Sequence, residues 1–234
     1  MIIGIDGNEA NVSRRVGIGE WAYQLLLQFS RFSQNSTSEV QYRIYLKDAP
    51  LADMPRENSN WQYHVFGPGK LWTQWRLPLD LTVHRPQPDV FFTPSHYAPR
   101  FSPVPTVTSV MDLSYFFFPE LFNKKDLYQL INWTKYSVQQ AKKIITISES
   151  SKDDIIKKYQ VPAHNIAVVY PGIKHPMNFE PNIYGFTQLQ EKYDLSANFV
   201  LFVGTLQPRK NIVRLIEAFA KVDPSKKEKL QLVV

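Results

Sequence analysis

Short apolar runs alternate along the chain with longer segments in which apolar residues recur every three or four positions. The short runs are typical of buried strands, and the longer segments are typical of helices that lay one face on a sheet. We expect strands at residues 2–6, 40–46, 61–66, 89–93, 106–111, 143–148, 166–170, 199–204 and 230–234. We expect helices at residues 19–32, 71–83, 121–141, 186–193 and 211–222, and a further helix that Ser148 caps and that runs to Tyr159. The alternation predicts an α/β fold with a Rossmann-like, mostly parallel sheet and helices on both faces.

Three prolines within eleven positions, at 171, 176 and 181, interrupt this pattern. We interpret residues 1–173 as one Rossmann-like domain, residues 174–198 as a linker, and residues 199–234 as the beginning of a second α/β domain. Two strands and one helix bury too little apolar area to fold alone, so we expect the second domain to be incomplete. Ligands of parallel sheets bind beyond the carboxyl ends of the strands, which places candidate chemistry just after each strand.

Composition narrows the classes of protein to which the chain can belong. The 234 residues include no cysteine, which excludes disulfides, Cys-ligated metal sites and thiol catalysis. No apolar run is long enough to span a membrane, and the start of the chain is typical of a buried strand and not of a signal peptide, so we expect a cytoplasmic protein. Residues 121–234 hold 17 Lys and Arg against 10 Asp and Glu. This basic half suits phosphorylated small molecules, an anionic membrane surface or solvated helix faces, and its scattered charges predict no nucleic-acid partner.

The first candidate motif is a glycine turn at the start of the first long helix. Gly17 and Gly19 begin a G-x-G-x-x-A pattern, in which the backbone can approach a ligand and the helix N-terminus favours an anion. Asp48 could serve as the acidic residue of a dinucleotide site. However, about ten residues separate the first strand from these glycines, which spoils the tight turn of such a site. Phosphate or sugar contact, dinucleotide binding and a plain helix start therefore all stay open.

The second candidate motif follows the expected strand 199–204. Gly204 ends that strand, and Arg209 and Lys210 precede a helix for which Asn211 is a candidate N-cap. An arginine fork and a lysine ammonium both suit a diphosphate. An exposed basic turn is the alternative.

Other side chains are ambiguous. His96 follows a strand and could contact an acceptor hydroxyl, or it could be an ordinary loop histidine. The other histidines, His64, His84, His164 and His175, show no metal-like spacing, so we interpret them as structural and predict no metal site. Trp72 and Trp75 have helical spacing and favour a stripe facing the core over a membrane contact or base stacking.

The motif with Arg209 and Lys210 closely resembles the opening of the donor-binding domain of family 4 glycosyltransferases, enzymes with the two-domain GT-B fold. This motif is residues 203–211 and continues at residues 215–219. Five further resembling pieces occur in the same order along nearly the whole chain: residues 16–19, 93–95, 111–114 with 118–120, 145–151 and 169–173.

This resemblance implies an acceptor-binding first domain followed by the beginning of a nucleotide-sugar-binding domain. It also implies transfer of a sugar with retention of configuration, commonly without a metal and with no cofactor besides the nucleotide sugar. Because residues 112–120 look like those of bacterial mannosyltransferases, GDP-mannose is the preferred donor. The site residues so assigned are Arg209, Lys210 and Asp112 for catalysis, Gly17, Gly19, Gly204, Arg209 and Lys210 for the donor phosphates, and Ser95 and His96 for the acceptor.

The sequence departs from the family pattern in two ways. Met111 stands where the family usually has an active-site histidine, and the Glu-x7-Glu motif of the donor pocket does not occur within the 234 residues. We therefore expect this chain to lack activity by itself, as part of a hexosyltransferase that acts on a glycan or lipid-linked acceptor with a peripheral contact to the inner membrane face. An inactive acceptor-binding lobe that needs a separate donor-binding chain is one alternative, and a dinucleotide-dependent oxidoreductase is another.

Overall fold

The computed structural model describes residues 1–35, 39–67, 69, 71–172, 183–223 and 230–234. The chain divides into two units, Met1–Gly172 and Ile173–Val234, and each is described by itself. The linker expected at residues 174–198 lies partly outside the described residues, and the described part of this linker includes a helix. His175 lies outside the described residues.

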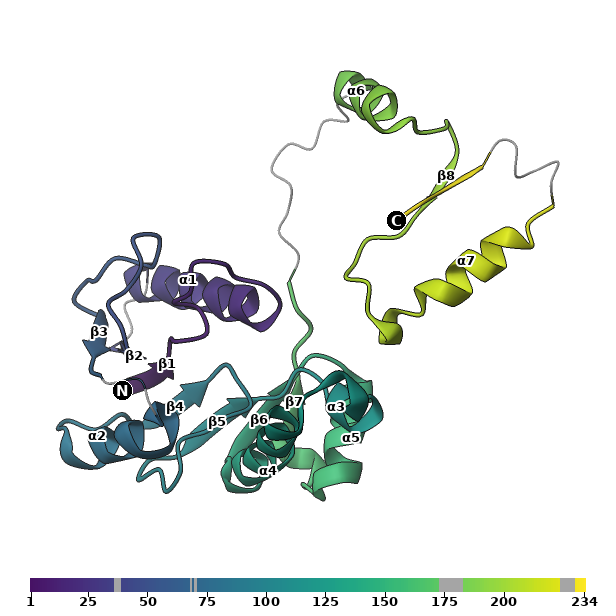
Figure 1. Cartoon of the computed structure of the whole chain (residues 1–234). Coiled ribbons are helices and arrows are strands. Elements are labelled where there is room, and N and C mark those ends of the chain that lie inside the picture. Colours follow the sequence, from purple (N-terminus) through teal and green to yellow (C-terminus); the bar gives the residue numbers. More distant parts are fainter. Residues whose placement is uncertain (36–38, 68, 70, 173–182, 224–229) are drawn as a thin grey trace. The chain divides into compact units, whose positions relative to one another are not determined.

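The first unit is built on one parallel sheet of seven strands in the order β3-β2-β1-β4-β5-β6-β7 (Figure 1). The order reverses at β1, which pairs with both β2 and β4. The strands are β1 (Ile2–Asp6), β2 (Gln41–Leu46), β3 (Trp61–Val65), β4 (Val90–Thr93), β5 (Thr106–Ser109), β6 (Lys143–Thr146) and β7 (Ile166–Val168). This Rossmann-like arrangement confirms the predicted fold class.

Helices cover both faces of this sheet, as Figure 1 shows. The helices of this unit are α1 (Ile18–Asn35), the π-helix η1 (Trp72–Arg76), α2 (Leu77–Val83), α3 (Ser114–Phe117), the 3-10 turn η2 (Pro119–Leu121), α4 (Lys124–Gln140), α5 (Glu149–Tyr159) and the 3-10 turn η3 (Ala163–Asn165). α1 packs Ala22 and Leu26 onto one face. α2 and α5 contribute to two separate buried clusters that include Tyr45 of β2 and Ile144 of β6. The core therefore lies between the sheet and both helix layers.

Side-chain caps begin two of these helices where the sequence places capping residues. The Ser148 hydroxyl accepts a hydrogen bond from the Ser151 amide at 3.1 Å, which confirms the predicted cap of α5. Asn123 caps α4 in the same way by accepting from the Asp126 amide at 2.9 Å. α4 therefore begins at Lys124, three residues later than the apolar pattern suggests.

The expected helix over residues 71–83 is instead a π-helix followed by α2. Pro78 lies in the first turn of α2, where a missing N–H leaves no hydrogen bond unmade. Trp72 is buried, but Trp75 is 69% exposed, so the prediction of a core-facing tryptophan stripe is wrong for Trp75. A π-helix has more residues per turn than an α-helix, so side chains three positions apart no longer share a face.

The second unit contains few elements and little burial. Its described elements are α6 (Ile183–Tyr193), β8 (Phe199–Leu201), the 3-10 turn η4 (Pro208–Lys210), α7 (Ile212–Ala220) and β9 (Gln231–Val233). β8 pairs with β9 in parallel, and α7 connects them. None of residues 185–223 and 230–234 is buried. In the described parts of both units, no helix combines the length and the apolar character needed to cross a membrane.

Candidate functional site

A cavity of about 490 Å³ lies at the carboxyl ends of the first unit's central strands. Its lining includes Gly17 before α1, His96 after β4, and Met111 and Asp112 after β5. Trp21, Tyr115 and Pro171 supply part of its apolar wall. The fold thus brings three residues predicted for the site, Gly17, His96 and Asp112, to one place, although they are far apart in the sequence.

The two glycines of the first motif have different roles. Gly17 has a φ of +51°, and a Cβ there would meet no described atom within 4 Å, so its backbone is open toward the cavity. A Cβ on Gly19 would lie 3.0 Å from the Glu9 carbonyl oxygen. Gly19 is outside the cavity lining and lets the loop after β1 pack against α1. Only Gly17 is therefore placed for close approach to a ligand.

His96 is an uncharged imidazole at neutral pH. Burial lowers the pKa of His96 to about 4, and the nearby negative charge of Asp112 opposes this shift only in part. A neutral imidazole can donate one hydrogen bond and accept another, which suits recognition of a sugar hydroxyl. The Asp112 carboxylate accepts a hydrogen bond from the Ser114 amide at 2.9 Å, which fixes its orientation at the cavity.

The position of His96 matters because Met111 stands where the resembling family usually has an active-site histidine. The Met111 side chain cannot act as a hydrogen-bonding imidazole, and its carbonyl accepts a hydrogen bond from the Ser151 hydroxyl at 2.9 Å. His96 lies in the same cavity and interacts electrostatically with Asp112. An imidazole is thus present beside this aspartate, supplied by the loop after β4.

Ser95 is separated from His96, although the sequence grouped the two residues. Ser95 is buried, and its carbonyl accepts a hydrogen bond from the Thr108 hydroxyl at 2.9 Å. It lines a second cavity of about 250 Å³ together with Asp6, Lys47 and Trp133. Adjacent residues at the end of a strand point in opposite directions, which explains the separation.

Sequence reasoning missed this second cavity, although Asp6 ends a strand. Burial raises the pKa of Asp6 to about 6, while hydrogen bonds from the amide and side chain of Asn8 favour its charged form. Burial also raises the pKa of Glu9, and the charge of Lys47 opposes that shift. Carboxylates beside aromatic side chains, here Trp72 and Trp133, are suited to bind sugar hydroxyls and ring faces.

The loop after β1 does not form a tight dinucleotide turn. It runs from Gly7 to the start of α1 and is tied to the segment after β2 by the Arg15–Asp53 ion pair. The Asn11 side chain also donates to the Ala49 carbonyl at 3.0 Å. Gly17 and Asp48 are therefore not arranged as in the dinucleotide fold that the glycine pattern left open.

The remaining predicted residues, Gly204, Arg209 and Lys210, belong to the second unit. They lie in the turn between β8 and α7, where all three are exposed. Arg209 Nε donates to Gln207 Oε1 at 2.8 Å. Asn211 precedes α7 as predicted, but its backbone is left-handed with a φ of 55°, and its side chain makes no capping hydrogen bond with any described residue. Asn211 therefore takes the predicted N-cap position of α7 without a side-chain capping hydrogen bond to a described residue.

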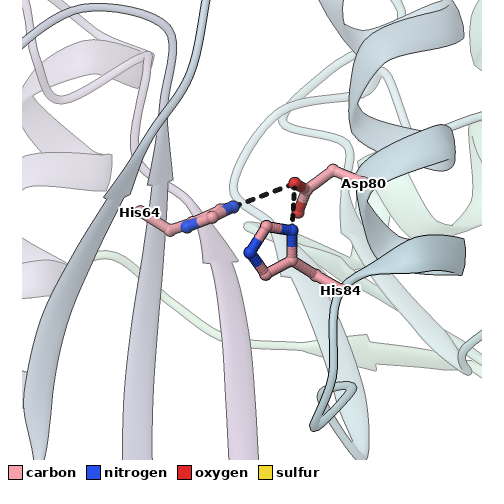
Figure 2. Close-up of side chains that lie close together, drawn as sticks. All are labelled: His64, Asp80 and His84. Carbon is pink, nitrogen blue, oxygen red and sulfur yellow. Dashed lines mark hydrogen bonds and ion pairs between the residues drawn. The ribbon is translucent and has the colours of Figure 1, made fainter.

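The described residues that could hold a metal lie away from both cavities. His64 of β3 and Asp80 and His84 of α2 and its end place three ligand atoms within 4.8 Å of one another (Figure 2). The spacing of the histidines in the sequence does not reveal this group, because it includes an aspartate and combines two elements of the fold.

A family model and two curated relatives match the sequence of the chain. The sequence model of Glycosyltransferase Family 4 matches residues 45–175. The chain is 33% identical over 112 residues to the O-antigen chain mannosyltransferase RfbU of Salmonella typhimurium, an alignment that covers 48% of this chain and 28% of the relative. It is 30% identical over 115 residues to O-antigen chain mannosyltransferase B of Escherichia coli, which covers 48% and 30%. The chain thus aligns with less than a third of the length of either curated relative.

Solved structures share the fold. Anabaena HepE in complex with UDP and glucose superposes with a TM-score of 0.59 at 16% identity, over 99% of this chain and 59% of that one. WaaG, a glycosyltransferase involved in lipopolysaccharide biosynthesis, superposes with a TM-score of 0.55 at 14% identity, over 99% and 62%. At this identity the similarity concerns the fold alone.

Proposed function

The chain belongs to glycosyltransferase family 4, and from this premise we propose that it forms part of a retaining transferase that moves mannose from GDP-mannose to a glycan or lipid-linked acceptor. The observation that carries this proposal is the cavity shared by Gly17, His96 and Asp112. It lies at the carboxyl edge of a parallel sheet, where α/β proteins bind their ligands.

Three groups that line the cavity or lie near it support this proposal. The open backbone of Gly17, next to the first turn of α1, suits the phosphate or sugar of the donor. Neutral His96 and the oriented carboxylate of Asp112 provide hydrogen-bonding groups for sugar hydroxyls. In this proposal Arg209 and Lys210 contribute positive charge toward the diphosphate as it leaves, which is electrostatic stabilisation of the transition state.

The choice of mannose rests on the two curated relatives, which are both named mannosyltransferases. A lipid-linked acceptor places the reaction at the cytoplasmic membrane face. An apolar stripe on η1 and α2 supports a peripheral contact there, since Trp75, Leu79 and Val83 are 60–69% exposed at successive spacings of four residues. Exposed Arg76 and Arg85 flank the stripe and would meet anionic headgroups.

The test uses the purified product of the complete gene, radiolabelled GDP-mannose or UDP-glucose, and membranes that carry lipid-linked glycans. We expect label to enter the lipid fraction from GDP-mannose. We expect His96→Gln and Asp112→Asn to lower kcat/KM at least about tenfold, the usual size of a lost catalytic hydrogen-bonding group. His164→Gln is the matched control, because His164 is an exposed histidine of the same unit.

Three results would revise the proposal. Transfer from UDP-glucose alone would replace mannose but keep the family chemistry. Full activity in both His96→Gln and Asp112→Asn would remove the cavity from the reaction. No transfer from either donor, together with retained glycan binding, would favour an acceptor-binding lobe that works with a separate donor-binding chain.

A further inference from the structure

We propose that His64, Asp80 and His84 form a binding site for a divalent transition-metal ion, of which Zn²⁺ is the best match. This inference does not depend on the proposed function, because none of the three residues lines the Gly17–His96–Asp112 cavity. It rests on geometry, on the donor atoms and on one unsatisfied buried oxygen.

Three side chains from two elements converge at this point (Figure 2). His64 Nε2 lies 2.9 Å from Asp80 Oδ1, and His84 Nδ1 lies 3.1 Å from the same oxygen. Asp80 lies in α2 and His84 directly follows its last residue. Because the two are four residues apart, they lie on the same face of the helix. The backbone N–H of His84 donates to the Asp80 carbonyl at 2.9 Å and holds that last turn in place.

The donor set fits zinc. Two imidazole nitrogens and one carboxylate oxygen are ordinary zinc ligands, at about 2.0–2.2 Å from the ion. At those bond lengths, the ligand atoms of a tetrahedral site lie about 3.4 Å apart. The observed 2.9 and 3.1 Å are close to this spacing, and all three ligand atoms lie within 4.8 Å of one another, so side-chain rotations could bring them around an ion.

The second oxygen of Asp80 also favours a cation. Asp80 Oδ2 is buried and makes no hydrogen bond with any residue that the structure describes. Buried carboxylate oxygens are rarely left without a partner. The hydrogen bond with His64 and the ion-pair contact with His84 both involve Oδ1. A metal could bind either oxygen and leave the other for an imidazole or water.

The rings are held in place without a metal, and one side of the site faces solvent. The His64 ring packs against Tyr45 and Phe66, with centroids 5.3 and 5.1 Å away. The His84 side chain is 56% exposed, against 24% for His64 and 11% for Asp80. The ion could therefore enter from the His84 side and take a water molecule as its fourth ligand, as open zinc sites do.

The position of the site suggests a structural role. His64 lies on β3, which is the edge strand at one side of the sheet. Asp80 lies in α2, and His84 follows the last residue of α2. A metal held by all three would link the edge strand to this helix. Bound metal would then stabilise the folded first unit, increasingly so as the concentration of free metal rises above the Kd.

The test titrates Co²⁺ and then Zn²⁺ into the untagged, chelator-treated chain of 234 residues. We expect one Co²⁺ per chain, with the visible absorption of tetrahedral cobalt, its displacement by one Zn²⁺, and a rise in Tm with zinc. We expect His64→Gln, Asp80→Asn and His84→Gln each to weaken binding more than about tenfold. His164→Gln should bind like the unaltered chain, because His164 lies outside the cluster.

His84→Gln is the decisive variant, because His84 is exposed at the end of α2 and its replacement leaves the core intact. Loss of the cobalt spectrum and of the zinc-dependent Tm rise in this folded variant would support the site. Metal binding of unchanged affinity in His84→Gln and His64→Gln, or no binding by the unaltered chain, would overturn it.

Discussion

The two units of the chain place their candidate residues in opposite environments. The first unit has a parallel sheet with buried clusters on both faces, and its side chains at the carboxyl edge are partly withdrawn from water. In the second unit, none of residues 185–223 and 230–234 is buried, and Arg209 and Lys210 are exposed. Burial changes the proton affinity of His96 and Asp6, whereas charges in water interact weakly. If Arg209 and Lys210 bind the leaving diphosphate as proposed, their positive charges would act more strongly with water excluded from the turn than in its exposed state.

We expect the largest effect on the free energy of unfolding when a buried isoleucine of the first unit is replaced, compared with an exposed isoleucine of the second unit. Ile144 of β6 is fully buried, whereas Ile216 of α7 is 51% exposed. Ile144→Ala should lower the free energy of unfolding by about 2–5 kcal/mol, because it leaves a cavity in the core. Ile216→Ala should change it by less than about 0.5 kcal/mol. Urea unfolding followed by tryptophan fluorescence measures both, since all five tryptophans lie in residues 1–172.

The same experiment shows whether the two units unfold independently. A shift of the tryptophan transition by Ile216→Ala as large as that of Ile144→Ala would mean that the second unit unfolds together with the first. Far-UV circular dichroism, which also reports α7, should then coincide with fluorescence. We expect the two signals to differ.

The next effect concerns pH. The pKa of His96 is lowered from 6.5 to about 4, so the unfolded chain binds a proton there more readily than the folded chain. The contribution of His96 to the free energy of unfolding should therefore decrease by up to about 3 kcal/mol as the pH falls from about 6.5 to about 4. The difference in unfolding free energy between the unaltered chain and His96→Asn should shrink over that range.

Two further variants make this pH test specific. Asp6, with a pKa raised from 3.8 to about 6, acts in the opposite sense, because stability from its protonated form is lost as the pH rises toward about 6. The difference between the unaltered chain and Asp6→Asn should therefore shrink as the pH rises. His164→Asn, at an exposed position of the same unit, controls for general effects of replacing a histidine. A difference that does not change with pH for His96→Asn would contradict the burial of His96 in the cavity.

Much of the first unit could be predicted from periodicity, because its strands are short apolar runs and its helices carry capping residues such as Ser148. The order of residues along parallel strands also predicts that Gly17, His96 and Asp112 lie near the same sheet edge. The prediction was wrong where local backbone geometry overrode periodicity, as at Trp75 in the π-helix. Asn211 takes the predicted N-cap position, but its left-handed backbone and the missing side-chain hydrogen bond to a described residue could not be foreseen. The His64–Asp80–His84 cluster could not be predicted, because it depends on how α2 packs against the edge strand.

We expect the smallest effect on the free energy of unfolding when one glycine from each unit is replaced by alanine. Gly17 has a φ of +51°, which an alanine adopts only with strain, so Gly17→Ala should lower the unfolding free energy by about 1 kcal/mol. A Cβ on Gly204 would meet the Phe202 ring at 3.4 Å, an ordinary contact, and its φ lies outside the left-handed region. Gly204→Ala should therefore change stability by less than about 0.5 kcal/mol. Urea midpoints from tryptophan fluorescence and circular dichroism together would report both, and a larger loss for Gly204→Ala than for Gly17→Ala would show that the second unit holds its turn more tightly than its exposure indicates.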